Sequence, residues 1–294
     1  MKKTLSIILL LCLCFGVVSC TPDEPEISYE SEIIDENGFF NLVIFERHGA
    51  VGIEESITER HMPDKTIEFM GKAYTGKYQH SSIPIKGLLP SYKAYYDAEN
   101  KVSFYVDEIT GNVIYFARNT QDVIAEEKQA IERGNVHTVL FNARNIANEY
   151  VGNISEYHIT IDGLDENPID NTDGYGWNVT YTKNVQGYPT SDYISISITH
   201  SGIIEEFRIG CIGAFDDFEQ EIDADKVKES INSKLSSFYG EKGSTINDIV
   251  FADEYLFKTS DGKVCLLSDV TVYLTLSDGT EAIEHPLVST LIKN

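Results

Sequence analysis

The chain has 294 residues, and 47 acidic residues against 23 Lys and Arg give it a formal charge of −24 at pH 7. Such a charge repels nucleic-acid phosphates and anionic lipid head groups, which argues against a nucleic-acid-binding function. Basic peptides and cations are the favoured partners, although the same charge also serves to keep a surface protein soluble.

The chain begins with the features of an export signal. A basic start is followed by an apolar run from Leu5 to Val18. This run is shorter than the about 20 residues that span a membrane, and it fits the core of a signal peptide. Residues 17–20, Val-Val-Ser-Cys, resemble the lipobox of bacterial lipoproteins. The resemblance implies that residues 1–19 are removed as a signal peptide and that lipid on Cys20 anchors the mature protein outside the cytoplasm.

Residues 20–35 are expected to form a lipidated flexible tether. Residues 21–35 contain two Pro and six acidic residues but few apolar ones, a composition that does not build a core. We expect the protein to lie on a cell membrane or an outer membrane, and the tether does not distinguish the two.

Strand patterns dominate residues 36–119, the first segment of the body. Tyr is abundant in the chain, beside many Ile and Val, which favours sheet. Strands are predicted at residues 39–45, 92–96, 102–107 and 113–116, with Gly111 in a tight turn before the last.

Two helices are expected next, at residues 121–133 and 136–151, where apolar side chains recur at three- and four-residue steps. Strand patterns follow at residues 156–162, 177–182, 192–199 and 203–209. Asp223 is then placed to cap a third helix that ends at Gly240. Further strands are predicted at residues 249–258, 263–267, 270–276 and 281–287. A helix followed by a four-stranded meander thus occurs twice, which indicates an α+β repeat.

The hairpin at residues 104–113 resembles the closing hairpin of the PepSY domain. Residues 177–181, 184–189, 192–194 and 201–207 are similar to the related YcdB/YcdC-type repeats of bacterial lipoproteins. The resemblance implies tandem PepSY-like units, each a helix packed on an antiparallel sheet: a degenerate β-rich unit at 36–119 and two clear units at 120–213 and 214–294. It also implies a non-catalytic exported module that inhibits peptidases or makes local interactions.

Two motifs suggest catalytic chemistry but are incomplete. Arg47-His48-Gly49 matches the start of the histidine-phosphatase signature, yet the later Arg and Pro positions hold Val51 and Ile53. Residues 71–77 have the spacing of a P-loop, but Tyr78 stands where Ser or Thr would hold magnesium.

An acidic loop and two cysteines leave open alternatives. Residues 162–173 carry five acidic side chains, which suit calcium, but without EF-hand spacing a solvated loop is favoured. Cys211 and Cys265 remain after export and lipidation, either as a disulfide or as buried thiols. Seven His residues, among them His61, His137 and His200, lack metal-site spacing.

These observations predict a non-catalytic protein- or peptide-binding or peptidase-regulating module, with Cys20 as its modified residue. We expect no catalytic, cofactor or metal site. An exported peptidase or peptide is the natural partner, captured by strand addition. The alternative is an exported hydrolase whose acidic site is scattered along the sequence. The oligomeric state is not predicted.

Overall fold

The computed structural model describes residues 27–34, 62–82, 92–130, 136–151, 153–164, 174–258 and 262–293. Strands make up 53% of these residues and helices 21%. The strands are β1 (Ser28–Ile34), β2 (Lys65–Phe69), β3 (Lys72–Ser82), β4 (Tyr92–Asp97), β5 (Val102–Asp107), β6 (Val113–Arg118), β7 (Tyr157–Leu164), β8 (Gly176–Val185), β9 (Tyr188–Thr199), β10 (Ile204–Ile209), β11 (Thr245–Lys258), β12 (Val264–Thr275), β13 (Glu281–Glu284) and β14 (Leu287–Lys293).

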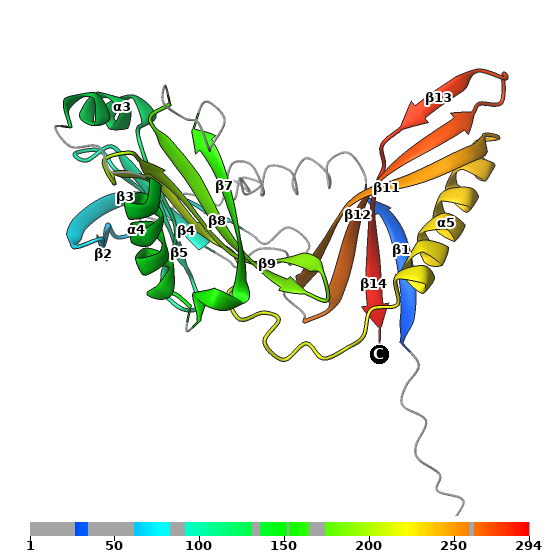
Figure 1. Cartoon of the computed structure of the whole chain (residues 1–294), viewed down its shortest axis with the longest axis horizontal. Helices are drawn as coiled ribbons and strands as arrows, with labels where there is room; N and C mark the ends of the chain where they lie inside the picture. The colour runs from blue at the N-terminus through cyan, green and yellow to red at the C-terminus, as the bar shows by residue number, and fades with distance from the viewer. Residues whose placement is uncertain are drawn as a thin grey trace, which may run out of the picture.

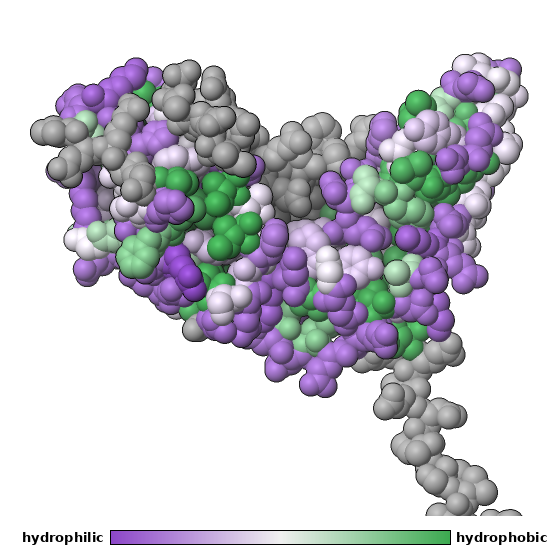
Figure 2. Space-filling view, in the orientation of Figure 1, coloured by the Kyte–Doolittle hydropathy of each residue, from purple (hydrophilic) through white to green (hydrophobic). Residues whose placement is uncertain are grey.

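The described strands join into one large mixed sheet. Eleven of them follow the order β1-β14-β12-β11-β9-β10-β6-β5-β4-β3-β2, while β13 pairs with β12, β8 with β9, and β7 with β8. Neighbouring strands are antiparallel except β9 and β11, which meet in parallel at a single residue pair, Thr190 and Leu256. Figure 1 shows a lobe on each side of this junction, and Figure 2 shows the same two lobes in a space-filling view. We call β2–β10 with their helices the N-terminal lobe, and β1 and β11–β14 with their helix the C-terminal lobe.

Two α-helices of the described part of the chain belong to the N-terminal lobe. Helix α3 (Thr120–Gln129) begins after Asn119, whose side chain accepts hydrogen bonds from two backbone N–H groups of the first turn. Helix α4 (Val136–Asn148) packs on β8 and β9. Its buried Val139, Ala143 and Ala147 share a core with apolar residues that alternate along those strands.

Helix α5 (Ala224–Glu241) covers the C-terminal lobe. Asp223 caps it by accepting hydrogen bonds from the next turn, as the sequence predicts. Val227, Ile231 and Leu235 recur every four residues and are buried against the sheet, where α5 packs on β1, β11 and β14. A buried hydroxyl network adds to this packing, because Ser31 Oγ lies 2.8 Å from both Ser230 Oγ and Thr290 Oγ1.

The prediction of tandem helix-on-sheet units is wrong, because the strands of the expected units pair with one another in one sheet. Strand β6, from the expected first unit, pairs with β10 from the second, and β9 meets β11 across the expected boundary at residue 213. The alternation of apolar residues tells which face of a strand is buried but not which strand lies beside it. Repeated local patterns therefore do not define separate sheets.

Three local expectations are corrected as well. Residues 28–34, which we expected in the flexible tether, form β1 and pair with β14. The strands expected at 263–267 and 270–276 are one strand, β12, because the intervening Ser268 is buried in the sheet. The strand expected at 281–287 is divided between β13 and β14 around Pro286. The strand expected at 39–45 lies outside the described residues.

Candidate functional site

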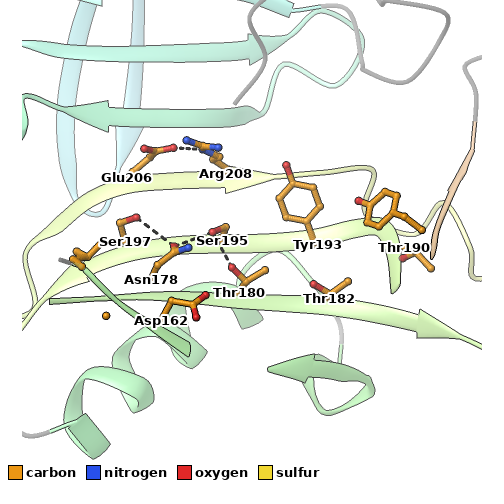
Figure 3. A pocket seen from close by; sticks show the side chains of 13 residues that line it. Asp162, Asn178, Thr180, Thr182, Thr190, Tyr193, Ser195, Ser197, Glu206 and Arg208 are labelled. Carbon is orange, nitrogen blue, oxygen red and sulfur yellow. Dashed lines mark hydrogen bonds and ion pairs between the residues drawn. The ribbon is translucent and has the colours of Figure 1, made fainter. Parts of the chain in front are cut away.

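A pocket of about 540 Å³ lies on the face of the N-terminal lobe that α4 leaves uncovered. Strands β7 to β10 form its floor, and Tyr255 on β11 brings the C-terminal lobe to its rim. Figure 3 shows the polar side chains of the floor in rows along the strands. The β8 row is Asn178, Thr180 and Thr182, and the β9 row is Tyr193, Ser195 and Ser197.

The period-two geometry of a strand explains why these side chains share a face. On β8, Val179 and Tyr181 are buried in the core under α4, so the residues between them point to the opposite side. On β9, Ile194 and Ile196 occupy the same core, which turns Ser195 to the pocket. The pocket is therefore the polar reverse side of a sheet whose other side is apolar.

The floor is held by a small hydrogen-bond network centred on Asn178. Its Oδ1 accepts hydrogen bonds from Ser195 Oγ at 3.0 Å and from Ser197 Oγ at 3.3 Å. The hydroxyl of Thr180 lies 3.0 Å from Ser195 Oγ, directly across from it on the neighbouring strand. These contacts fix the rotamers of the floor and pre-organise its polar groups.

Beyond the hydroxyl rows, an ion pair continues along the same face. Glu206 and Arg208, both on β10, pair with each other in the pocket lining. The Arg208 guanidinium lies 5.7 Å from the ring centroid of Tyr115, a cation–π contact. Tyr115 in turn packs on Tyr105, with ring centroids 4.4 Å apart. Burial raises the pKa of Tyr105 to about 12 and raises that of Tyr115 as well, so both phenols stay protonated at neutral pH.

This arrangement is equipped for hydrogen bonding to a polar ligand. The residues described around the pocket include neither His nor Cys, and within the described part of the chain no three acidic, His or Cys side chains gather as a metal site would require. Asp162 and Glu206 are the acidic groups of the lining, and Glu206 forms an ion pair with Arg208.

Several candidates from the sequence fall elsewhere or outside the described residues. Cys20, Arg47-His48-Gly49, His61 and residues 165–173 of the acidic loop lie outside them. Gly71 sits in the β2–β3 turn with φ of 70°, and the rest of the P-loop-like stretch is part of β3, so no phosphate-binding loop forms there. His200 is buried and bonds the carbonyl of Gly174 at 2.8 Å, which gives it a structural role.

The two late cysteines are thiols and do not form a disulfide with each other. Cys211 lies in the segment after β10 and Cys265 is buried in β12. Burial raises the pKa of the Cys211 thiol, which lowers its reactivity. Neither lies in the pocket lining.

Sequence reasoning missed the pocket itself. The alternation of Ser195 and Ser197 with buried Ile residues was visible as a strand pattern, and such a run of small hydroxyls on one face is the signal that could have indicated a polar site. Asn178 gave no comparable signal, because its meeting with these serines depends on the β8–β9 register.

Among the described residues, no helix combines the length and the apolarity that a membrane crossing needs. Comparisons with known proteins do not supply a family for the chain, and the PepSY-like resemblance gains no support from them. No family model, no curated protein and no solved structure matches this sequence.

Proposed function

We propose that the chain is a non-catalytic binding module, held outside the cytoplasm by lipid on Cys20, and that it takes its ligand in the sheet pocket. The observation that carries this proposal is the pre-organised floor of the pocket, where Asn178, Ser195 and Ser197 hold one another in place. Small-molecule sites typically measure ~300–1,000 Å³ and use a few fixed polar groups for orientation. The pocket, at about 540 Å³, fits that description.

A second candidate function, capture of an extended peptide, is favoured by the free edge of β7. In the described part of the chain β7 pairs with β8 alone, and Ile159 on it is 47% exposed. A peptide that adds here as a strand gains main-chain hydrogen bonds. Asp162 and Leu164 of β7 also line the pocket, so side chains of such a peptide reach it. An exported peptidase segment is the partner that suits this edge.

The alternative of an exported hydrolase rests on Asp162 and Glu206, the two acidic groups of the pocket lining. Glu206 is held in an ion pair with Arg208, and this pair would have to break before the carboxyl could act on a bound molecule. Turnover of a bound molecule, lost in Asp162→Asn and Glu206→Gln, would replace the binding proposal with this one.

The binding proposal is tested with the full-length lipidated protein in detergent, screened by thermal shift against a mixed library of saccharides, peptides and nucleosides. We expect a ligand that raises the Tm of the wild type and not of Asn178→Ala. Thr66→Ala is the matched control, because its hydroxyl pairs with Thr75 on the exposed β2–β3 hairpin away from the pocket. If a ligand raises the Tm of Asn178→Ala as much as that of the wild type, the pocket is not its binding site.

Strand addition at β7 is tested with Ile159→Pro and Thr160→Pro. Neighbouring residues of an edge strand point their N–H groups alternately toward the partner strand and toward solvent, so one of these variants removes an N–H from the free edge. That variant is expected to stay folded and lose peptide binding. Retained peptide binding in both variants would rule out this edge.

A further inference from the structure

The pocket floor is a grid of uncharged groups that both donate and accept hydrogen bonds. Thr180 and Ser195 are directly opposite each other on β8 and β9, and Asn178 and Ser197 form the next opposite pair. Neighbouring strands lie ~4.8 Å apart and alternate residues along a strand lie ~6.8 Å apart, so the grid offers several contacts to one small ring-shaped ligand. Hydroxyl hydrogens rotate to suit either role.

Asn178 offers the most directional contact of this grid. Its carbonyl oxygen is already occupied by the hydroxyls of Ser195 and Ser197. Its amide nitrogen has no acceptor among the described residues, which leaves two N–H donors for a ligand. Thr182, further along β8, lines the pocket without taking part in that network. A ligand that presents hydroxyl oxygens would satisfy both residues.

The charges around the pocket argue against a ligand that carries net charge. Among the described residues that line the pocket, Arg208 is the only basic one, and it is paired with Glu206 rather than available to an anion. The chain as a whole, at −24, also repels anions. Asp162 alone remains for a cation, and it is exposed on β7, where water screens its attraction.

Aromatic rings complete the lining. Tyr193 rises from the β9 row, as Figure 3 shows, and Tyr255 comes from β11. A tyrosine ring presents an apolar face next to a polar tip, and so it packs on a ligand that is apolar on one face and polar around its rim. Sugar rings have this character, with C–H groups on their faces and hydroxyls at their edges.

We infer that the pocket binds a neutral saccharide, recognised by the hydroxyl and amide grid of β8 and β9 and packed against Tyr193 and Tyr255. This inference rests on the proposed binding function and specifies its ligand class. The bound ligand would touch both lobes, because Tyr255 of the C-terminal lobe belongs to the lining.

The test is isothermal titration of the full-length lipidated protein, in detergent, with neutral hexasaccharides of glucose, mannose, xylose and N-acetylglucosamine. We expect one of them to bind with a Kd that changes less than about twofold between roughly 0.05 and 0.5 M NaCl, because salt screens charged contacts only. Asn178→Asp keeps an acceptor for the serines but loses the amide donors, and it should weaken binding about tenfold.

Thr182→Val is the second variant, since it keeps the shape of the side chain and removes one hydroxyl; about three- to tenfold weaker binding is expected. Thr66→Ala should bind as the wild type does. Saccharide binding that both pocket variants leave unchanged would overturn the site. If only charged peptides bind and Asn178→Asp abolishes that binding, the saccharide inference is wrong and the proposed binding function still holds. If no hexasaccharide and no member of the mixed library binds, both proposals fail.

Discussion

Tyr157 donates a hydrogen bond of 2.6 Å from its phenol to Oδ1 of Asp192, a carboxylate that is completely buried. The other oxygen of Asp192 accepts the backbone N–H of Gly213 at 2.8 Å. One buried acid therefore ties the edge strand β7 and the start of β9 to the segment that leads to α5. This joint connects the pocket-bearing strands to the C-terminal lobe.

Removing the phenol should weaken this joint. Tyr157→Phe leaves one oxygen of a buried carboxylate without its donor, and hydrogen bonds to charged groups contribute about 1.5–3 kcal/mol. We expect the free energy of unfolding to fall by that amount in urea titrations. Tyr96→Phe, at a phenol that is 39% exposed, is the control and should change it by less than about 0.5 kcal/mol. Equal effects of the two substitutions would contradict the role of the buried bond.

Asp192 should also make stability depend on pH. Burial raises the pKa of this carboxyl above its ordinary value, although the bonds from Tyr157 and Gly213 oppose the shift. The folded protein then holds the proton more tightly than the unfolded chain does. The resulting stabilisation is complete below the unfolded pKa of about 3.9 and is lost as the pH rises through the folded pKa. Urea titrations from pH 3.5 upward should show this decline in the wild type relative to Asp192→Asn. Parallel curves for the two proteins would refute it.

Two glycines should respond oppositely to alanine. A Cβ on Gly210 would meet the backbone carbonyl of Ser191 and the ring of Tyr193, so Gly210→Ala is expected to cost about 1–3 kcal/mol of stability. A Cβ on Gly240, in the last turn of α5, meets nothing within 4 Å. Gly240→Ala should therefore raise the free energy of unfolding by about 0.4–1 kcal/mol. Thermal unfolding of the two variants gives the comparison. If Gly210→Ala stabilises the protein, the segment after β10 does not pack on β9 as described.

A cavity in one lobe should loosen that lobe more than the other. Leu235 is fully buried between α5 and the C-terminal sheet, and Leu235→Ala should cost about 2–5 kcal/mol. The sheets of the two lobes pair through only one pair of described residues on β9 and β11, and beyond it Val185 and Tyr188 pack on the C-terminal core. Amide hydrogen exchange is thus expected to rise in β11–β14 well before it rises in β3–β6. Uniform acceleration across both groups of strands would indicate a single cooperative unit.

The two thiols should react only when the chain unfolds. Cys265 is buried, and burial raises the pKa of Cys211. We expect slow labelling by a maleimide in the native mature protein and fast labelling of two thiols in urea without reductant. Absence of free thiols in urea would indicate that the two cysteines are paired.

Local features of the fold were predictable, because short-range physics sets them. Asp223 and the four-residue spacing of Val227, Ile231 and Leu235 predict α5 to within about one residue of its observed ends. The alternation of Ile194 and Ile196 likewise predicts β9 and its buried face. In each case the information lies within a few residues of the element that it specifies.

Pairing over long distances was not predictable. Residues 28–34 are rich in acid and read as a tether, yet their alternate side chains face β14 and α5, where Ser31 bonds Ser230 and Thr290. The residues near β1 in the sequence do not indicate that β14 and α5 are its partners. The pocket has the same origin, because Asn178 meets Ser195 and Ser197 only through the register of β8 and β9.

The place of β1 has a consequence for how the protein matures. Residues 28–34 are made early in synthesis, but the sole partner of β1 among the described strands is β14, which is made much later. Ser31 and Thr290, which bond to each other, are 259 residues apart. Such distant contacts form late and slowly. The newly made chain therefore keeps β1 without a partner until β14 has been made, and a variant without β14 would leave that sheet edge open to aggregation.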